Sequence, residues 1–220
     1  MANRSDARSA ILGSIRGALR VPAERDGKAR EAEYAALPRG YKQSSAKSGA
    51  DLIELLTHRL EEYDAGVLRV ARNEITAAVE RLLNQRGRKR IGIPDDLPAA
   101  WLPAGFDFEK ASAFDAHRLD ALDGVLTGCT VAIAETGSIV LQNAAGQGSR
   151  ALSLVPDYHL CIVLAAQIVE TVPECFARLD ATAYLPTTFF SGPSATADIE
   201  MTRIKGVHGP RFLDVLIVAD

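Results

Sequence analysis

The chain contains 220 residues, of which 47% are hydrophobic and 24% are charged, and its formal net charge is −3. These proportions are those of an ordinary globular protein and exclude collagen-like, coiled-coil and wholly disordered chains. The longest apolar run, Leu160 to Ala166, has seven residues, whereas a membrane-spanning helix needs roughly 20. The N-terminus is polar and lacks the apolar segment of a secretory signal, so we expect a cytoplasmic protein without a membrane span.

The basic residues and the cysteines exclude two further classes of protein, namely nucleic-acid binders and proteins that hold a metal or an iron–sulfur cluster. The one basic cluster, RGRKR at residues 86–90, lies between a helical pattern and a short apolar strand, which is typical of a solvated helix end. We therefore expect no nucleic acid partner. The three cysteines, Cys129, Cys161 and Cys175, are separated by 32 and 14 residues, which fits neither zinc nor iron–sulfur spacing. The sequence predicts no metal site and no cluster bound by this chain itself.

An amphipathic helix is predicted at residues 6–20, where Ile11, Ile15 and Leu19 recur at helical spacing. Residues 21–50 combine prolines, glycines and charges without a sustained period, which indicates an extended or partly disordered connection. We therefore divide the chain into an N-terminal helix and extended arm, residues 1–50, and an α/β domain, residues 51–220.

Helical and strand patterns alternate beyond the arm. Apolar residues recur at helical spacing from Leu52 to Leu60 and from Ile75 to Leu83, and strand patterns follow at residues 66–71 and 90–94. Such alternation favours an α/β domain with a largely parallel sheet flanked by helices, because parallel strands need crossover connections. Residues 95–124 are less regular, and we assign no firm elements to them.

The segment 125–169 is nearly free of charge, and its only acidic or basic residues are Glu135, Arg150 and Asp157. We expect it to be buried on both faces, as the central strands of an α/β sheet are. Strands are predicted at residues 131–134, 138–141 and 159–164, the first two joined by a short connection. The remaining predicted elements are a helix at 172–179 and strands at 187–191 and 212–218.

The first candidate site is the stretch AAGQGSR at residues 144–150, which follows a strand and precedes a short helical pattern. Gly146, Gln147 and Gly148 would present backbone N–H groups to a phosphate or carboxylate, and Arg150 would add a positive charge. A tight strand-to-helix turn is the alternative, because the spacing matches neither a dinucleotide fingerprint nor a phosphate loop.

Glu135 is the second candidate, an acidic residue at the end of an apolar strand and followed by Thr136 and Gly137. Burial would raise the pKa of its carboxyl group, which would then act as a base or a nucleophile. The alternative is a turn acid bonded to neighbouring backbone N–H groups, which is common.

His159 is the third candidate. Asp157 and His159 fall on the same side of an extended chain, so the carboxylate would orient the imidazole. A histidine whose hydrogen bonds are satisfied at the start of a strand is the alternative.

Two loops near the C-terminus complete the candidates. The first follows a predicted strand, at the carboxyl end where open α/β sheets gather functional groups, although its hydroxyl residues also suit helix caps. Its candidate residues are Ser191, Gly192, Ser194, Thr196 and Asp198. The second loop, GVHGP at residues 206–210, holds His208 and Gly209 in a segment with little side-chain bulk. No GxSxG or HExxH motif occurs, so serine hydrolase and zinc hydrolase functions lack support.

In their order and spacing, these motifs resemble the signature of the lactate utilization protein C family. They are AIAETGS at 132–138, GQG at 146–148 with RALSL at 150–154, SGPS at 191–194 with TADIE at 196–200, and GVHGP at 206–210. The resemblance is strong over residues 120–220 and looser upstream. It implies a LUD domain with the NagB/RpiA/CoA-transferase-like α/β fold, in agreement with the alternation of elements.

The resemblance also implies a role in oxidising L-lactate to pyruvate alongside two partner proteins that carry iron–sulfur clusters. A chain without cluster or flavin motifs cannot move two electrons alone, so we expect a non-redox component that binds a small anionic metabolite. The family match marks Glu135 and the glycine loops as site positions without assigning a catalytic role. The alternative is an independent enzyme of the CoA-transferase or sugar-phosphate isomerase type, with Glu135 as nucleophile or base, which rests on analogy between folds.

Overall fold

The computed structural model describes residues 4–19, 27–196, 204–205 and 209–219. The chain forms two compact units, Met1–Tyr41 and Lys42–Asp220. The smaller unit contains α1 (Arg4–Ala18), which confirms the predicted first helix, and α2 (Gly27–Ala35). The predicted extended connection is wrong for the nine residues of α2. This segment is rich in the helix formers Ala, Glu, Lys and Arg, but α2 buries no residue and therefore leaves no apolar period to detect.

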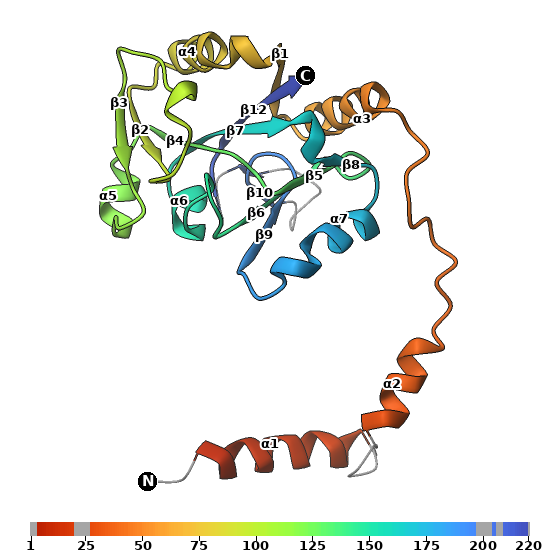
Figure 1. The fold of residues 1–220 in the computed structure, drawn as a ribbon. Coiled ribbons are helices and arrows are strands. Elements are labelled where there is room, and N and C mark those ends of the chain that lie inside the picture. Colours follow the sequence, from red (N-terminus) through yellow and green to blue (C-terminus); the bar gives the residue numbers. More distant parts are fainter. Residues whose placement is uncertain (1–3, 20–26, 197–203, 206–208, 220) are drawn as a thin grey trace. The chain divides into compact units, whose positions relative to one another are not determined.

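A six-stranded parallel sheet organises the larger unit (Figure 1). Its strands, in spatial order, are β1 (Gly66–Ala71), β12 (Phe212–Ala219), β7 (Tyr158–Leu164), β4 (Gly124–Thr127), β2 (Arg90–Ile93) and β3 (Asp107–Lys110). Every neighbouring pair is parallel, which confirms the predicted α/β class with a largely parallel sheet. His159 of β7 lies opposite Val125 of β4 and Leu213 of β12, so the second residues of three strands meet at one edge.

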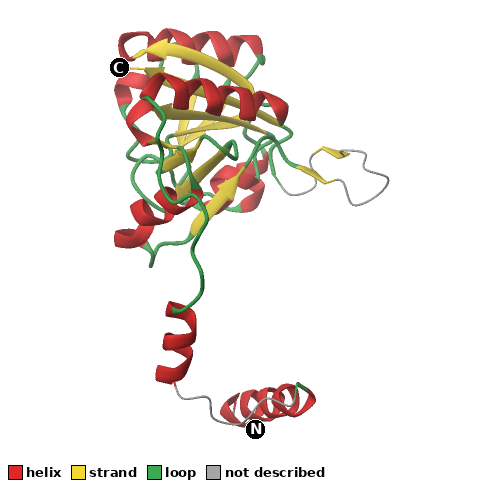
Figure 2. Cartoon of the chain, turned by 90° about the vertical axis from the view of Figure 1, so that its right-hand side faces the viewer, coloured by secondary structure: helices red, strands yellow, loops and turns green. Residues whose placement is uncertain are grey.

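A second, four-stranded sheet contains the strands predicted on either side of Glu135. In spatial order it consists of β8 (Ile168–Val169), β5 (Val131–Ile133), β6 (Ser138–Gln142) and β9 (Thr187–Phe190). β6 is antiparallel to both β5 and β9. The predicted burial of β5 and β6 is confirmed, but they belong to this separate sheet rather than to the parallel one. A two-stranded ribbon, β10 (Ala195–Thr196) and β11 (Ile204–Lys205), extends from the chain after β9 (Figure 2).

Helices cover both sheets. They are α3 (Gly49–Glu62), α4 (Ile75–Gln85), α5 (Ala116–Asp120), α6 (Arg150–Leu154) and α7 (Val172–Leu179), with 3-10 turns at η1 (Arg72–Glu74), η2 (Ala99–Trp101), η3 (Ala165–Gln167) and η4 (Asp180–Thr182). α4 packs on one face of the parallel sheet, whereas α3 and the second sheet share the core on the other face. α7 closes the outer face of the second sheet. No helix among the described residues has the length and apolar character to cross a membrane.

Local sequence explains where the longer helices begin. The Ser48 hydroxyl accepts a hydrogen bond from the Asp51 amide, and the Asp51 carboxylate accepts one from the Ser48 amide, which forms a capping box at α3. Thr171 and Glu174 form the same device at α7. These two caps fix the helices that cover the second sheet and thereby hold β9, the strand next to the site described below.

Candidate functional site

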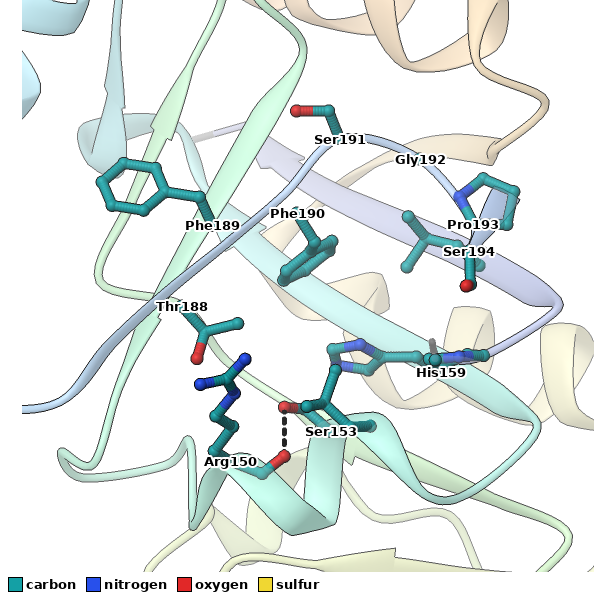
Figure 3. A pocket seen from close by; sticks show the side chains of 14 residues that line it. Arg150, Ser153, His159, Thr188, Phe189, Phe190, Ser191, Gly192, Pro193 and Ser194 are labelled. Atoms are coloured by element: carbon teal, nitrogen blue, oxygen red, sulfur yellow. Dashed lines mark hydrogen bonds between the residues drawn. The ribbon is translucent and has the colours of Figure 1, made fainter. Parts of the chain in front are cut away.

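A pocket of about 320 Å³ lies where α6, β9 and the first residues of β7 and β12 converge (Figure 3). Its polar lining includes Arg150, Ser153, His159, Thr188, Ser191 and Ser194, and its apolar lining includes Leu154, Phe189, Phe190, Pro193, Pro210 and Leu213. A volume of this size is at the lower end of the range for small-molecule sites, and the mixture of apolar walls with a few polar groups is typical of them.

Arg150, the first residue of α6, is the only charged residue among the described residues that line the pocket. The α6 turn begins because the Ser149 hydroxyl accepts a hydrogen bond from the Leu152 amide. Arg150 is exposed, and within the described part of the chain no carboxylate pairs with its guanidinium. In Figure 3 this guanidinium extends toward Thr188, and Ser153 donates to the Arg150 carbonyl oxygen at 3.1 Å. Arg150 therefore offers a positive charge to a bound anion.

His159 is 2% exposed and lines the pocket. Its Nε2 atom is hydrogen bonded to the Thr127 hydroxyl at 2.8 Å, and its ring centre lies 5.3 Å from that of Phe190. Burial disfavours the charged imidazolium and lowers the pKa of His159 to about 4. The ring is therefore neutral near pH 7, and Nδ1 is the nitrogen left to contact a ligand.

The predicted pairing of Asp157 with His159 is wrong. The Asp157 carboxylate instead accepts hydrogen bonds from the Arg211 guanidinium at 2.6 and 3.0 Å, and Arg211 holds the pKa of Asp157 below its usual range. β7 begins at Tyr158, so Asp157 lies before the strand. The rule that residues two apart in a strand point to the same side therefore does not apply to Asp157 and His159. The alternative, a hydrogen-bonded histidine at a strand start, is confirmed with Thr127 as the partner.

The loop after β9 brings three predicted residues to the pocket. Ser191 is hydrogen bonded to Ser138 at 2.6 Å, which ties the loop to β6. Gly192 has a φ of +82°, and a Cβ atom there would lie 2.5 Å from Cβ of Tyr63, so this position requires glycine. The Ser194 amide donates to the Pro210 carbonyl at 2.8 Å, which joins this loop to Gly209 and the start of β12.

Three other predicted residues belong to these loops. Thr196 was expected as a possible cap of a helix, but the backbone of Ala195–Thr196 forms β10 and pairs with β11. Asp198 and His208 lie outside the described residues.

The pocket lies at the edge opposite to the one that we expected for an open α/β sheet. His159 and Leu213 are the second residues of β7 and β12, so the pocket is at the amino ends of these parallel strands. Only β9 presents its carboxyl end here, and β9 belongs to the mixed sheet. The rule that ligands bind at the carboxyl ends of strands holds for parallel strands, so β9, a strand of the mixed sheet, is not covered by it.

Several polar groups of the glycine turn at residues 146–148 are hydrogen bonded within the protein. The Gly146 amide donates to the Asp96 carboxylate at 2.8 Å. The Gln147 side-chain oxygen accepts from the Thr130 hydroxyl at 2.9 Å and from the Gln142 amide at 2.7 Å. A Cβ atom on Gly148 would lie 2.6 Å from a methyl group of Leu152. This geometry favours the strand-to-helix turn over an anion cradle, although Arg150 at its end reaches the pocket.

Glu135 does not line the pocket. Its side chain is exposed, so the burial on which its reactivity was predicted to depend is absent. Gly137 packs against α3, where a Cβ atom would lie 2.9 Å from Cβ of Arg59, and Thr136 donates to Ser138 at 2.8 Å. The Glu135–Gly137 turn is therefore a packed connection that reaches the pocket only through the hydroxyls of Thr136, Ser138 and Ser191.

The sequence analysis missed several buried polar residues, of which Thr127 and Glu170 make the contacts that matter here. Thr127 ends an otherwise apolar strand, and its hydroxyl could be recognised only once β4 was known to lie beside β7. Glu170 is 2% exposed, forms an ion pair with Lys42 and accepts from the Ser45 hydroxyl at 2.6 Å. These bonds lower the pKa of Glu170 to about 2. The signal in the sequence that could have revealed Glu170 is its position as an acidic residue directly after an apolar strand.

Metal ligands do not cluster in the described part of the chain, where no group of three or more His, Cys, Asp or Glu side chains could hold an ion. The three cysteines are buried free thiols. The chemistry available to the pocket is thus binding by one guanidinium, one neutral imidazole, hydroxyl groups and apolar walls.

Comparison with known proteins places this architecture in a family. The LUD domain model matches residues 39–218. A lactate utilization protein C from Deinococcus radiodurans is 42% identical over 174 residues, which cover 78% of this chain and 81% of that protein. A lactate utilization protein C from Exiguobacterium sp. is 36% identical over 154 residues, covering 64% and 66% of the two chains.

A solved structure gives the same assignment. The crystal structure of a DUF162 family protein from Deinococcus radiodurans is 36% identical and superposes with a TM-score of 0.69, covering 78% of this chain and 99% of that chain. These matches confirm the resemblance found in the sequence motifs. The chain belongs to the LUD domain family.

Proposed function

We propose that this chain is a non-redox component of lactate utilisation, which binds a small anionic metabolite in the pocket around Arg150 and His159. The relatives named lactate utilization protein C support the metabolic role. Iron–sulfur proteins that oxidise L-lactate to pyruvate would be its partners, and those partners would hold the clusters. The complex would act in the cytoplasm.

The single observation that carries the binding proposal is the charge of the pocket. Arg150 has no carboxylate partner among the described residues, and it lies beside hydroxyl groups and a buried imidazole. A guanidinium binds a carboxylate through two charge-assisted hydrogen bonds, and such bonds contribute about 1.5–3 kcal/mol. A neutral His159 adds no second positive charge, so the pocket suits a monoanion better than a phosphate ester.

The alternative of an independent enzyme built on Glu135 has no supporting geometry. Glu135 is exposed and does not line the pocket. We therefore do not propose a catalytic role for Glu135.

Isothermal titration calorimetry of the full chain against L-lactate, pyruvate, longer monocarboxylates and inorganic phosphate tests the binding proposal. At least one carboxylate should bind, and Arg150→Gln should weaken it about 10- to 100-fold. The matched control is Arg81→Gln, which removes an exposed arginine from α4 and should leave the affinity unchanged. Equal affinities of the wild type and Arg150→Gln would refute the proposed site.

Reconstitution tests the metabolic role. L-lactate oxidation is measured in extracts of a strain that lacks this chain but keeps the proposed iron–sulfur partners. Addition of the purified chain should restore the activity. Full activity without the chain would contradict the proposed role while leaving the binding result unaffected.

A further inference from the structure

We infer that the pocket ligand is a 2-hydroxy- or 2-oxo-carboxylate with an apolar side chain larger than the methyl group of lactate. In this inference Arg150 binds the carboxylate, His159 hydrogen bonds the oxygen on the second carbon, and the wall around Phe190 packs on the side chain. The inference rests on the proposed binding of an anion and deepens it by naming the ligand class.

His159 has one ring nitrogen available to a ligand. Nε2 is hydrogen bonded to Thr127, and within the described residues Nδ1 has no hydrogen-bond partner, although His159 is only 2% exposed. Because His159 lines the pocket, a ligand is the group that can satisfy Nδ1. A matching ligand atom would take the place of solvent at this nitrogen.

The second step concerns which ligand atom matches. A hydroxyl both donates and accepts, so Thr127 is compatible with either tautomer of His159. When Thr127 donates to Nε2, Nδ1 carries the proton and donates to a carbonyl oxygen. When Nε2 donates to Thr127, the hydroxyl turns its proton toward Cys161 Sγ, 3.9 Å away, and Nδ1 accepts from an alcohol. Either tautomer of His159 can therefore hydrogen bond an oxygen on the carbon next to the carboxylate, while Arg150 supplies the positive charge that favours the carboxylate itself.

The third step concerns position. In Figure 3 the His159 ring lies between the Phe190 ring and Ser153, and Arg150 lies beyond Ser153 on the same helix. A ligand that contacts both side chains would therefore present its carboxylate to Arg150 and a neighbouring oxygen to His159. The adjoining carbon is where a 2-hydroxy or 2-oxo group stands.

The fourth step concerns size. The pocket volume of about 320 Å³ equals that of about ten water molecules at ~30 Å³ each. Lactate has six non-hydrogen atoms and displaces at most about six of these waters. The remaining space borders Leu154, Phe190 and Leu213, so it favours an apolar side chain of three or more additional carbons.

The test uses four acids and isothermal titration calorimetry of the full chain at pH 7. They are 2-hydroxy-4-methylpentanoate, 2-oxo-4-methylpentanoate, 4-methylpentanoate, which lacks the second-carbon oxygen, and L-lactate. At least one of the two oxygenated branched acids should bind tenfold or more tightly than both 4-methylpentanoate and L-lactate. His159→Phe should abolish the advantage over 4-methylpentanoate but retain the dependence on Arg150.

The outcomes separate this inference from the proposed function. If 4-methylpentanoate binds as tightly as its oxygenated forms, His159 does not recognise oxygen and the inference is refuted, while anion binding stands. If L-lactate binds as tightly as the branched acids, the size argument is refuted. If no carboxylate binds, the proposed binding function also fails. Circular dichroism checks that His159→Phe folds. If the variant does not fold, the comparison of the four acids on the wild-type protein still tests the inference.

Discussion

The hydroxyl of Thr127 lies 2.8 Å from Nε2 of His159, and this hydrogen bond joins β4 to β7 directly beneath the pocket. The parallel register creates the contact, because Val125 faces His159 across the two strands and Thr127 lies two residues further along β4. The bond fixes the orientation of a buried imidazole and directs its other nitrogen to the pocket. The following predictions examine this arrangement and the contacts that support it.

Protein stability should depend on pH through His159. Burial lowers the pKa of His159 from 6.5 to about 4, so below pH 6.5 the unfolded chain binds more protons than the folded chain. The stabilisation from neutral His159 is complete above pH 6.5 and is lost progressively as the pH falls toward 4, with a total of about 3 kcal/mol. Urea unfolding at pH 7.0 and pH 5.0 measures this loss for the wild type and for His159→Phe. The loss should shrink in His159→Phe and persist in His117→Gln, which changes an exposed histidine; equal losses in all three proteins would contradict burial of a neutral ring.

Gly192→Ala should destabilise the protein by more than about 2 kcal/mol, because the φ of +82° is strained for alanine and the new methyl group would collide with Tyr63. Gly105→Ala is the matched control: Gly105 has a φ of +84° but open space around it, so only the backbone cost of about 1 kcal/mol applies. Thermal unfolding followed by circular dichroism compares the two. Similar losses in both variants would show that Gly192 is not packed against α3.

Glu170→Gln should loosen residues 42–48 from the second sheet. The Glu170 carboxylate holds Lys42 and the Ser45 hydroxyl, and these bonds lower its pKa from 4.5 to about 2. Their stabilisation is present above pH 4.5 and is lost as the pH falls toward 2. Because Lys42 is half exposed, we expect at pH 7 a smaller loss of stability than the full cost of breaking a buried pair.

Hydrogen exchange measured by mass spectrometry follows this change locally. The Ser45 amide donates to Glu174 at 2.8 Å and should exchange faster in Glu170→Gln. Glu62→Gln, which breaks an exposed ion pair with Arg59, is the control and should leave the Ser45 amide protected. Unchanged protection in Glu170→Gln would mean that Glu170 does not anchor this segment.

Glu135→Gln should leave ligand affinity and stability unchanged, the latter within about 0.5 kcal/mol, because Glu135 is exposed and outside the pocket. Calorimetry with the tightest-binding acid and thermal unfolding are sufficient to check this. Loss of binding, or trapping of a covalent adduct at Glu135, would favour the enzymatic alternative and contradict our assignment of the site.

Apolar patterns in the sequence predicted several elements closely. β7, β12 and α7 were found within one or two residues, because their apolar patterns are long and end at turns or caps. The division into two sheets was not predicted, since a strand that is buried on both faces looks the same in either sheet. The short β3 and α5 have few residues in which a pattern can repeat.

The residues of the candidate site were also predicted only in part. Arg150 and His159 were found because a charge and an imidazole are conspicuous in an apolar segment. Their partners were not, because hydrogen bonds depend on register and distance in the fold: Asp96 reaches Gly146 across 50 residues, and Thr127 reaches His159 across 32. The Gly146 and Gln147 amides therefore seemed free for a ligand, whereas they donate to Asp96 and to the Ala144 carbonyl.

The most direct test of the central claim is the side-chain nitrogen NMR spectrum of 15N-histidine-labelled protein at pH 7, recorded during titration with 2-hydroxy-4-methylpentanoate. The arrangement around Arg150 and His159 predicts a neutral His159 whose Nδ1 resonance shifts as the ligand binds, with no such shift in Arg150→Gln. A charged His159, or an Nδ1 resonance that stays in place while calorimetry records binding, would contradict it.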